Sequence, residues 1–327
     1  MFKEMKVKPL SCLVSALLGV FPLTAFAAQL LVLNKSDATL VFMDPASGRA
    51  NATVATGEGP HEIEVSSDGQ LAFISNYGAS TAGTSLCVID VAQRKERKRV
   101  DLQDLRRPHG LSFSEGHVYF TAEDSRSIGR YDPKAQQVDW RFDTKQERTH
   151  MILASRDGTK LFTSNMGSNS IGVLERGPND QWHQTLVAVG EGPEGLDESP
   201  DGRELWTAHS RDGGISIIDT STKKVAHTVH IKTKRSNRLK FTPDGKHVLV
   251  SDLGSGELVI IDARQRAERT RLSLGRSPTG ILIEPEGRRA YVAVSGDNRI
   301  AVVDLQTMKV ERTIETGNSP DGMAWVR

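Results

Sequence analysis

Residues 278–304 read PTGILIEPEGRRAYVAVSGDNRIAVVD, and this stretch decides the fold. Ile281 and Ile283 alternate with other residues, a Glu-Gly pair follows at 286–287, and apolar runs return at 291–294 and 302–303. Alternation with a period of two is typical of a half-buried strand, and a Gly-containing turn between two such runs is typical of a hairpin. The stretch therefore predicts three consecutive antiparallel strands.

The same pattern recurs along the chain. Each copy begins with Pro or a substitute, and six copies pass through Asp-Gly or Glu-Gly into a second strand. A third strand, which ends in an apolar-Asp signature in most copies, and a more variable fourth complete the unit. The residues after the Pro-like position, about 42 residues apart, are His61, His109, His150, Glu194, Asn237, Thr279 and Asp321. Seven radially repeated units predict an all-β fold, a seven-bladed β-propeller with four antiparallel strands per blade.

The two ends of the chain complement each other. The last copy stops after one strand at 320–326, whereas residues 29–56 contain three strands before the first complete copy. We expect these four strands to form one blade, so that pairing of the N- and C-terminal strands closes the ring and protects its edges.

Residues 1–27 predict a signal peptide. Three lysines fall within the first eight residues, residues 10–28 are mostly apolar, and Ala25-Phe26-Ala27 provides the small-x-small pattern for cleavage. We expect a periplasmic or secreted protein whose single domain is 28–327, with no membrane span after cleavage. The alternative is an uncleaved anchor helix, because an apolar stretch of about 19 residues could nearly span a bilayer.

The overall charge argues against polyanionic partners. The chain has 42 Lys and Arg against 41 Asp and Glu, a net charge of +1. A nearly neutral chain has no net electrostatic field that would attract nucleic acid or an anionic membrane, so we expect no nucleic-acid partner. We also expect a monomer. Cys87 is the one cysteine outside the predicted signal peptide, which excludes an intramolecular disulfide, and its apolar surroundings in the sequence predict a buried, inert thiol.

The combination of Pro-x-Gly, Asp-Gly, aromatic-Val-Thr-Asn-like and Val-Ile-Asp segments over residues 29–327 resembles the YVTN or YncE-type β-propeller repeat family of exported bacterial proteins. The resemblance implies the propeller fold and export. It does not imply one activity, because members range from proteins of unknown role to enzyme-associated propellers.

Three histidines and one glutamate are candidate metal ligands. His61, His109 and His150 follow the Pro-like position in three consecutive blades, and Glu194 follows it in the next. Equivalent positions converge on the propeller axis, and imidazoles with one carboxylate suit a divalent transition metal such as Zn, Cu, Mn or Fe. His209, at the end of a second strand, is a candidate further ligand or catalytic acid/base. The alternative is that these residues only line a water-filled channel.

Charged residues predict a second feature of the channel. Glu62, Glu64 and Asp197 occupy first-strand positions opposite Arg238 and Lys240, which would make a polarised channel suited to a zwitterionic or anionic ligand. Mutual charge compensation is the equally simple alternative. The full set of predicted ligand-binding residues is Glu62, Asp197, Arg238, Asp252 and Asp321.

Two functional hypotheses follow from the sequence. The first is an exported propeller that binds a small molecule or metal in its central funnel, with a lyase, lactonase-like hydrolase or oxidoreductase-accessory activity if it is an enzyme. The second is a non-catalytic scaffold that holds another envelope protein. We find no haem-attachment, nucleophile-elbow, zinc-protease or phosphate-loop motif that would select an enzyme class.

Overall fold

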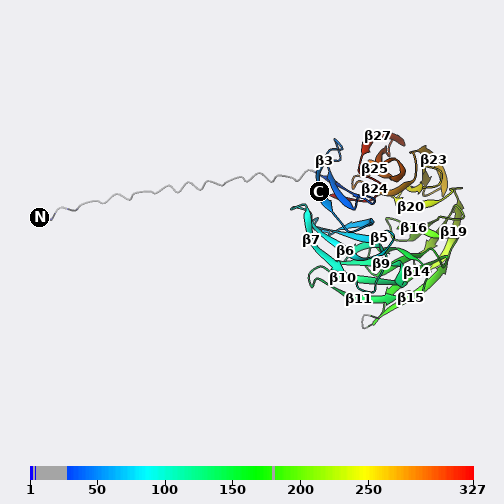
Figure 1. The fold of residues 1–327 in the computed structure, drawn as a ribbon, viewed down its shortest axis with the longest axis horizontal. Coiled ribbons are helices and arrows are strands. Elements are labelled where there is room, and N and C mark those ends of the chain that lie inside the picture. The colour runs from blue at the N-terminus through cyan, green and yellow to red at the C-terminus, as the bar shows by residue number, and fades with distance from the viewer. Residues whose placement is uncertain (3, 5–27, 179–180) are drawn as a thin grey trace.

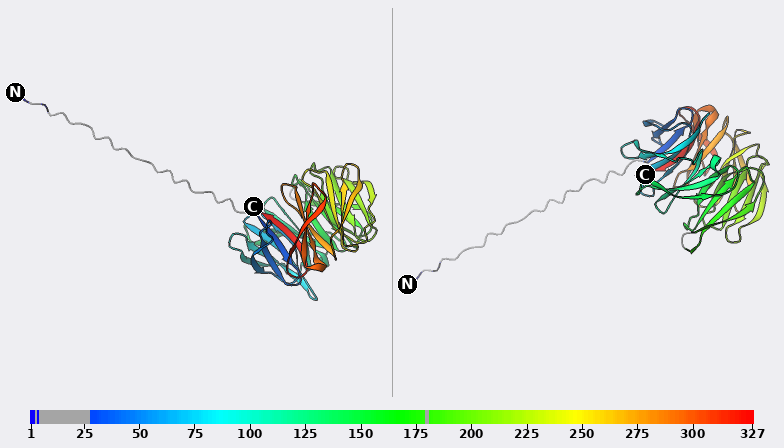
Figure 2. Two further views of the ribbon diagram at one scale, coloured as in Figure 1. Left: turned by 90° about the horizontal axis from the view of Figure 1, so that it is seen from above. Right: turned by 60° about the horizontal axis from the view of Figure 1, so that its bottom comes forward.

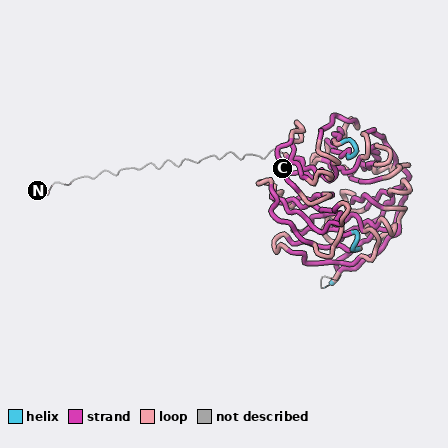
Figure 3. The backbone as a smooth tube through the Cα atoms, in the orientation of Figure 1, coloured by secondary structure: helices cyan, strands magenta, loops and turns pink. Residues whose placement is uncertain are grey.

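The computed structural model describes residues 1–2, 4, 28–178 and 181–327. Strands dominate these residues, and short 3₁₀ turns lie at Glu123–Ser125 and Ser295–Asp297 (Figure 3). Nearly all of the predicted signal peptide lies outside the described residues. Within the described part, no helix is long and apolar enough to cross a bilayer.

Four complete blades come first along the chain. Blade 1 consists of β4 (Pro60–Val65), β5 (Leu71–Gly78), β6 (Ala82–Asp90) and β7 (Lys95–Asp101). Blade 2 consists of β8 (Pro108–Ser114), β9 (His117–Ala122), β10 (Ser127–Asp132) and β11 (Gln137–Asp143). Blade 3 consists of β12 (Thr149–Ala154), β13 (Lys160–Asn165), β14 (Ser170–Arg176) and β15 (Trp182–Ala188). Blade 4 consists of β16 (Pro193–Glu198), β17 (Glu204–His209), β18 (Gly214–Asp219) and β19 (Lys224–His230).

Two further complete blades follow, and the seventh blade is shared between the two ends of the domain. Blade 5 consists of β20 (Ser236–Phe241), β21 (His247–Asp252), β22 (Glu257–Asp262) and β23 (Ala267–Ser273). Blade 6 consists of β24 (Pro278–Ile283), β25 (Arg289–Val294), β26 (Arg299–Asp304) and β27 (Lys309–Glu315). Blade 7 consists of β28 (Pro320–Val326), β1 (Gln29–Asn34), β2 (Thr39–Met43) and β3 (Ala50–Ala55).

The seven sheets are arranged as a closed ring (Figure 1). The innermost strands contact one another in the order β4, β8, β12, β16, β20, β24, β28 and back to β4. β28 pairs antiparallel with β1, which places the two ends of the propeller domain side by side (Figure 2). The predicted seven-bladed propeller and its closure are therefore confirmed.

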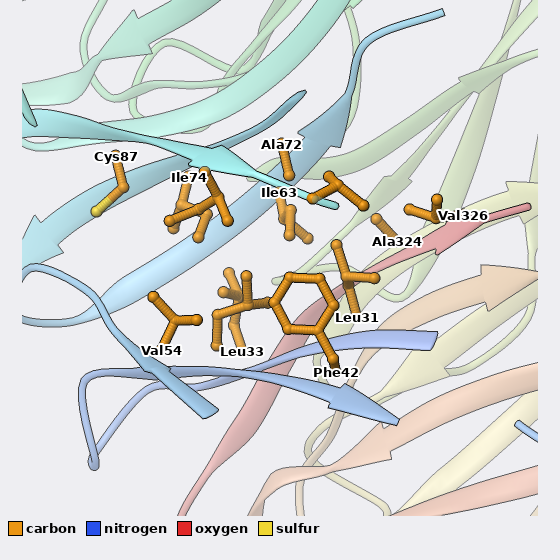
Figure 4. Packing of buried hydrophobic residues seen from close by; sticks show 13 residues of the cluster. Leu31, Leu33, Phe42, Val54, Ile63, Ala72, Ile74, Cys87, Ala324 and Val326 are labelled. Carbon is orange, nitrogen blue, oxygen red and sulfur yellow. The ribbon is translucent and has the colours of Figure 1, made fainter. Parts of the chain in front are cut away.

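Apolar side chains fill the space between neighbouring blades. Between blades 7 and 1, Leu31, Leu33 and Phe42 pack against Ile63 and Ile74 (Figure 4). Cys87 is buried in this cluster, and burial raises the pKa of its thiol, as expected for an inert structural cysteine.

Glycines of the Pro-x-Gly segments let the innermost strands approach one another closely. A Cβ atom on Gly280 would lie 2.2 Å from the carbonyl oxygen of Asp321 in the next blade, and one on Gly322 would lie 2.5 Å from that of His61. A side chain at either position would push neighbouring blades apart, so the close packing of the innermost strands requires glycine there.

Candidate metal centre on the propeller axis

A β-bulge creates each axial position. In blade 1 the pairing of β4 with β5 shifts between Pro60 and Ile63, so His61 and Glu62 together oppose Ser75. The innermost strand of every other blade shifts at the same place. A bulge bends the strand and re-aims its side chains. We use "axial residues" for the seven residues that follow the Pro-like position.

Three axial residues form a histidine row. The ring centroids of His61 and His109 are 3.9 Å apart, and those of His109 and His150 are 3.7 Å apart. His109 and His150 are buried, and His61 is mostly so. Burial, reinforced by His150, His61 and nearby cations, holds the pKa of His109 well below its usual range. His109 is therefore neutral, which is the protonation state that binds a metal ion.

Glu123 orients one of these rings. Its Oε1 is hydrogen-bonded to Nδ1 of His150, and its Oε2 accepts a hydrogen bond of 2.7 Å from the Tyr77 hydroxyl. Burial alone would raise the pKa of Glu123, but the contacts with His150 and Tyr77 lower it to about 2. The ionised carboxylate thus accepts from Nδ1–H and leaves Nε2 of His150 as the free ring nitrogen.

Two more axial carboxylates border the row. Oε1 of Glu194 lies 3.9 Å from Nε2 of His150 and accepts a hydrogen bond from Asn237. Oδ2 of Asp321 lies 3.2 Å from Nδ1 of His61, although the two groups are not aligned for a hydrogen bond. The predicted residues His61, His109, His150, Glu194 and Asp321 are therefore brought together at one level of the axis.

Several buried polar atoms at this level have no hydrogen-bond partner within the described structure. They are Nδ1 of His61, Nδ1 of His109, Nε2 of His150, Oε2 of Glu194 and Oδ1 of Asp321. Ligand atoms of His61 and His109 lie within 4.8 Å of each other, as do those of His109 and His150. Leaving buried polar groups unpaired costs free energy, so a cluster of them with metal-ligand chemistry fits a bound cation.

Hydroxyl side chains of the second strands hold the axial residues in place. Thr121 Oγ1 accepts a hydrogen bond of 2.8 Å from the Gly110 amide at the bulge of blade 2 and donates one of 2.7 Å to the His150 carbonyl of blade 3. Ser75 and Ser164 make the corresponding bonds to the His109 and Glu194 carbonyls. In blades 1, 2, 3 and 5 a Ser or Thr thus links the bulge to the axial residue of the next blade.

Replacing Thr121 with Val tests this link. The substitution leaves the buried Gly110 amide and His150 carbonyl without these bonds, so we expect a loss of about 1–3 kcal/mol in the free energy of unfolding, measured by urea titration. The matched control is Thr163→Val, because the buried Thr163 hydroxyl has no hydrogen-bond partner in the described structure and its removal is expected to be neutral or stabilising. Equal losses in both variants would contradict the role of the link.

An ion pair crosses the channel beside the histidine row. Arg238 on β20 of blade 5 bonds to Glu62 on β4 of blade 1, two blades that are not neighbours in the ring. Burial alone would raise the pKa of Glu62, but Arg238 and His61 lower it to about 2. The opposed charges predicted for the channel therefore meet directly in this pair.

Other predicted residues lie in different surroundings. His209 Nδ1 donates a hydrogen bond of 2.9 Å to Oδ1 of Asp212, and its electrostatic neighbours are Asp212 and His230. Asp197 accepts a hydrogen bond of 2.8 Å from the Phe241 amide of the next blade. Asp252 accepts bonds from several backbone amides of its own loop and of the preceding one. The structure thus gives all three side chains partners in or between blades.

Sequence reasoning missed Tyr77 and left Glu123 outside the ligand set. By the pairing of the first two strands, Glu123 is equivalent to Tyr77 of blade 1 and Met166 of blade 3, one position beyond Asn76 and Asn165. Both Asn side chains bond within their own blades. A carboxylate directly after the second strand of blade 2, beside a blade whose axial residue is His, was the signal that could have found it.

The family model for the YNCE-like beta-propeller matches residues 5–326. The chain belongs to the YncE-like β-propeller family. No curated protein matches this YncE-like propeller in sequence.

Solved structures share the fold of the YncE-like propeller at low identity. The periplasmic gluconolactonase PpgL of Pseudomonas aeruginosa is 18% identical, with a TM-score of 0.77 over 92% of this chain and 99% of that one. Hydrazine synthase of Kuenenia stuttgartiensis is 21% identical, with a TM-score of 0.71 over 81% and 88%. Apo AztD of Citrobacter koseri is 13% identical, with a TM-score of 0.69 over 92% and 98%. At such identities the likeness concerns the fold alone.

Proposed function

We propose that this YncE-like propeller binds one divalent transition-metal ion at the histidine row. The observation that carries the proposal is the row of buried, unpartnered ligand atoms of His61, His109 and His150, in which ligand atoms of His109 lie within 4.8 Å of those of each neighbour. Glu194, with an unpartnered oxygen of its own, lies beside His150. Imidazole nitrogens with one carboxylate oxygen suit borderline ions such as Zn²⁺. The ion would supply a Lewis acid.

His109 and Glu123 have different roles at the proposed metal site. His109 lies between the other two histidines, so its removal disrupts both contacts in the row. Glu123 is a positioning residue, because both of its oxygens are already engaged by His150 and Tyr77. A hydrogen-bonded carboxylate of this kind fixes the ring orientation and raises its basicity as a ligand.

We also propose that the protein works outside the cytoplasm. The basic start, apolar stretch and Ala-x-Ala pattern of residues 1–27 support export. The fold is shared with a protein described as a periplasmic gluconolactonase, which is consistent with a propeller that functions in that compartment.

Titration of chelator-treated protein with Zn²⁺ tests the metal site. By isothermal calorimetry we expect one ion per chain for the wild type and at least a hundredfold weaker binding for His109→Ala. Glu123→Gln should weaken binding about 10–100-fold, as loss of a partner that orients a ligand commonly does. The matched control is His227→Ala, which removes an exposed histidine of β19 and should bind as the wild type does.

The pattern across the variants decides the outcome. Equal Zn²⁺ affinity in the wild type and His109→Ala, with both proteins melting cooperatively, would overturn the metal-site proposal. So would the absence of binding by the wild type, because the unpartnered atoms would then be satisfied by water.

A further inference from the structure

The axial channel contains a cavity of about 340 Å³ beside the Glu62–Arg238 pair. Its wall combines charged side chains with apolar ones, among them Met151, Leu153, Leu282 and Trp325. The histidine row does not line it. A volume of this size lies within the range of small-molecule sites, which combine apolar walls with a few polar groups.

The cavity is lined by two successive pairs of opposed charges. In the first, Glu62 and Arg238 are joined by an ion pair. Glu64 and Lys240 lie two residues further along β4 and β20, and both line the cavity. Lys240 is close enough to act electrostatically on Glu64, yet no ion pair joins them in the described structure. Glu64 and Lys240 are therefore not bonded to each other, whereas Glu62 and Arg238 are.

The charges of the wall select a ligand class. Glu62 and Arg238 compensate each other, which leaves the Glu64 carboxyl and the Lys240 ammonium available among the apolar side chains that line the cavity. Burial raises the pKa of Glu64 to about 7 against the opposite effect of Lys240, and a cationic group bound beside Glu64 would hold it ionised. A ligand with a single charge would satisfy Glu64 or Lys240 but leave the other without a partner. A ligand with one charge of each sign satisfies both, and a short apolar group on it would contact Met151 and Leu153.

We propose that this cavity binds an α-amino acid with an apolar side chain. The ammonium of the ligand pairs with Glu64, and its carboxylate pairs with Lys240. The site is separate from the metal centre and does not depend on the metal proposal.

Calorimetric titration with L-leucine and L-methionine tests the site. We expect saturable binding of at least one of them at one molecule per chain. Isocaproate, which lacks the ammonium of leucine, and isoamylamine, which lacks its carboxylate, should each bind at least about tenfold more weakly, because each leaves one wall charge unpaired. Glu64→Gln and Lys240→Met should weaken amino-acid binding by a similar factor.

Two further variants make the result specific. Lys240→Arg keeps the positive charge and should restore much of the binding lost in Lys240→Met, which separates loss of charge from misfolding. His109→Ala should bind the amino acid as the wild type does, so that failure of the metal proposal and failure of this one are distinguishable. Absence of binding by both amino acids, equal binding of isocaproate, or unchanged binding in Glu64→Gln and Lys240→Met would overturn the proposal.

Discussion

We expect that deletion of residues 320–327 leaves a chain that does not fold cooperatively. β28 is the innermost strand of blade 7, pairs with β1, and contacts the innermost strands β4 and β24 on its two sides. Its loss opens the ring, exposes the hydrogen-bonding edge of β1, and uncovers Leu31 and Leu33 in the adjoining core. We expect no sharp thermal transition by circular dichroism and aggregation at concentrations where the full chain is soluble.

The matched control for this deletion is removal of Arg327 alone. Arg327 is exposed and forms an ion pair with Glu286 at the surface, so its loss should leave the melting temperature nearly unchanged. A truncated chain ending at residue 319 that remains soluble and melts in one sharp transition would show that six blades and an open edge suffice, contrary to the closure described above.

Replacement of Arg238 with Met is expected to cost about 3–5 kcal/mol in the free energy of unfolding at neutral pH, because it leaves the Glu62 carboxylate in the channel without its partner. The two side chains form an ion pair across the ring, and Arg238 is buried. Met keeps much of the aliphatic volume of Arg, so the loss reports mainly on the charge. Urea denaturation at several pH values provides the measurement.

The pH dependence follows from the lowered pKa of Glu62. Folding holds this pKa at about 2, below the ordinary value of 4.5, so the pair contributes stability above pH 4.5 that is lost as the pH falls toward 2. In Arg238→Met the buried carboxyl takes up a proton more readily. The deficit of the variant should therefore be largest at neutral pH and shrink on acidification.

The double variant Glu62→Gln/Arg238→Met completes the design. It removes both charges and should recover most of the lost stability, because a neutral pair has no uncompensated buried charge. A deficit in Arg238→Met that is independent of pH, or that the second substitution does not relieve, would contradict the role of the ion pair.

The fold could be predicted from the sequence because it depends on repetition. Seven copies of one short pattern, with one strand at the C-terminus and three at the N-terminus, admit few arrangements other than a closed ring. The same reasoning placed His61, His109, His150 and Glu194 on the axis, because equivalent positions of a radial repeat must converge. The Asp residues that end third strands, such as Asp90 and Asp304, accept hydrogen bonds from backbone amides of the turns that follow.

The details of the site depend on contacts between blades. The bulge at each axial position and the hydroxyl link from Thr121 to His150 set where each side chain is aimed, and neither can be read from the local pattern. Glu123 reaches His150 because two different blades bring them together. His209 ends the second strand of blade 4, at the position that Ala122 occupies in blade 2, and contacts Asp212.

By itself the sequence determined the architecture of this protein, its ring closure and the residues that reach the axis. Only the tertiary structure decided which of those residues meet. Glu62 touches Arg238 across the ring, whereas Glu64 and Lys240, two residues further along the same strands, are not paired and line a cavity. The physical reason is that a repeat specifies backbone positions, while side-chain contacts across the axis depend on the width of the channel at each level.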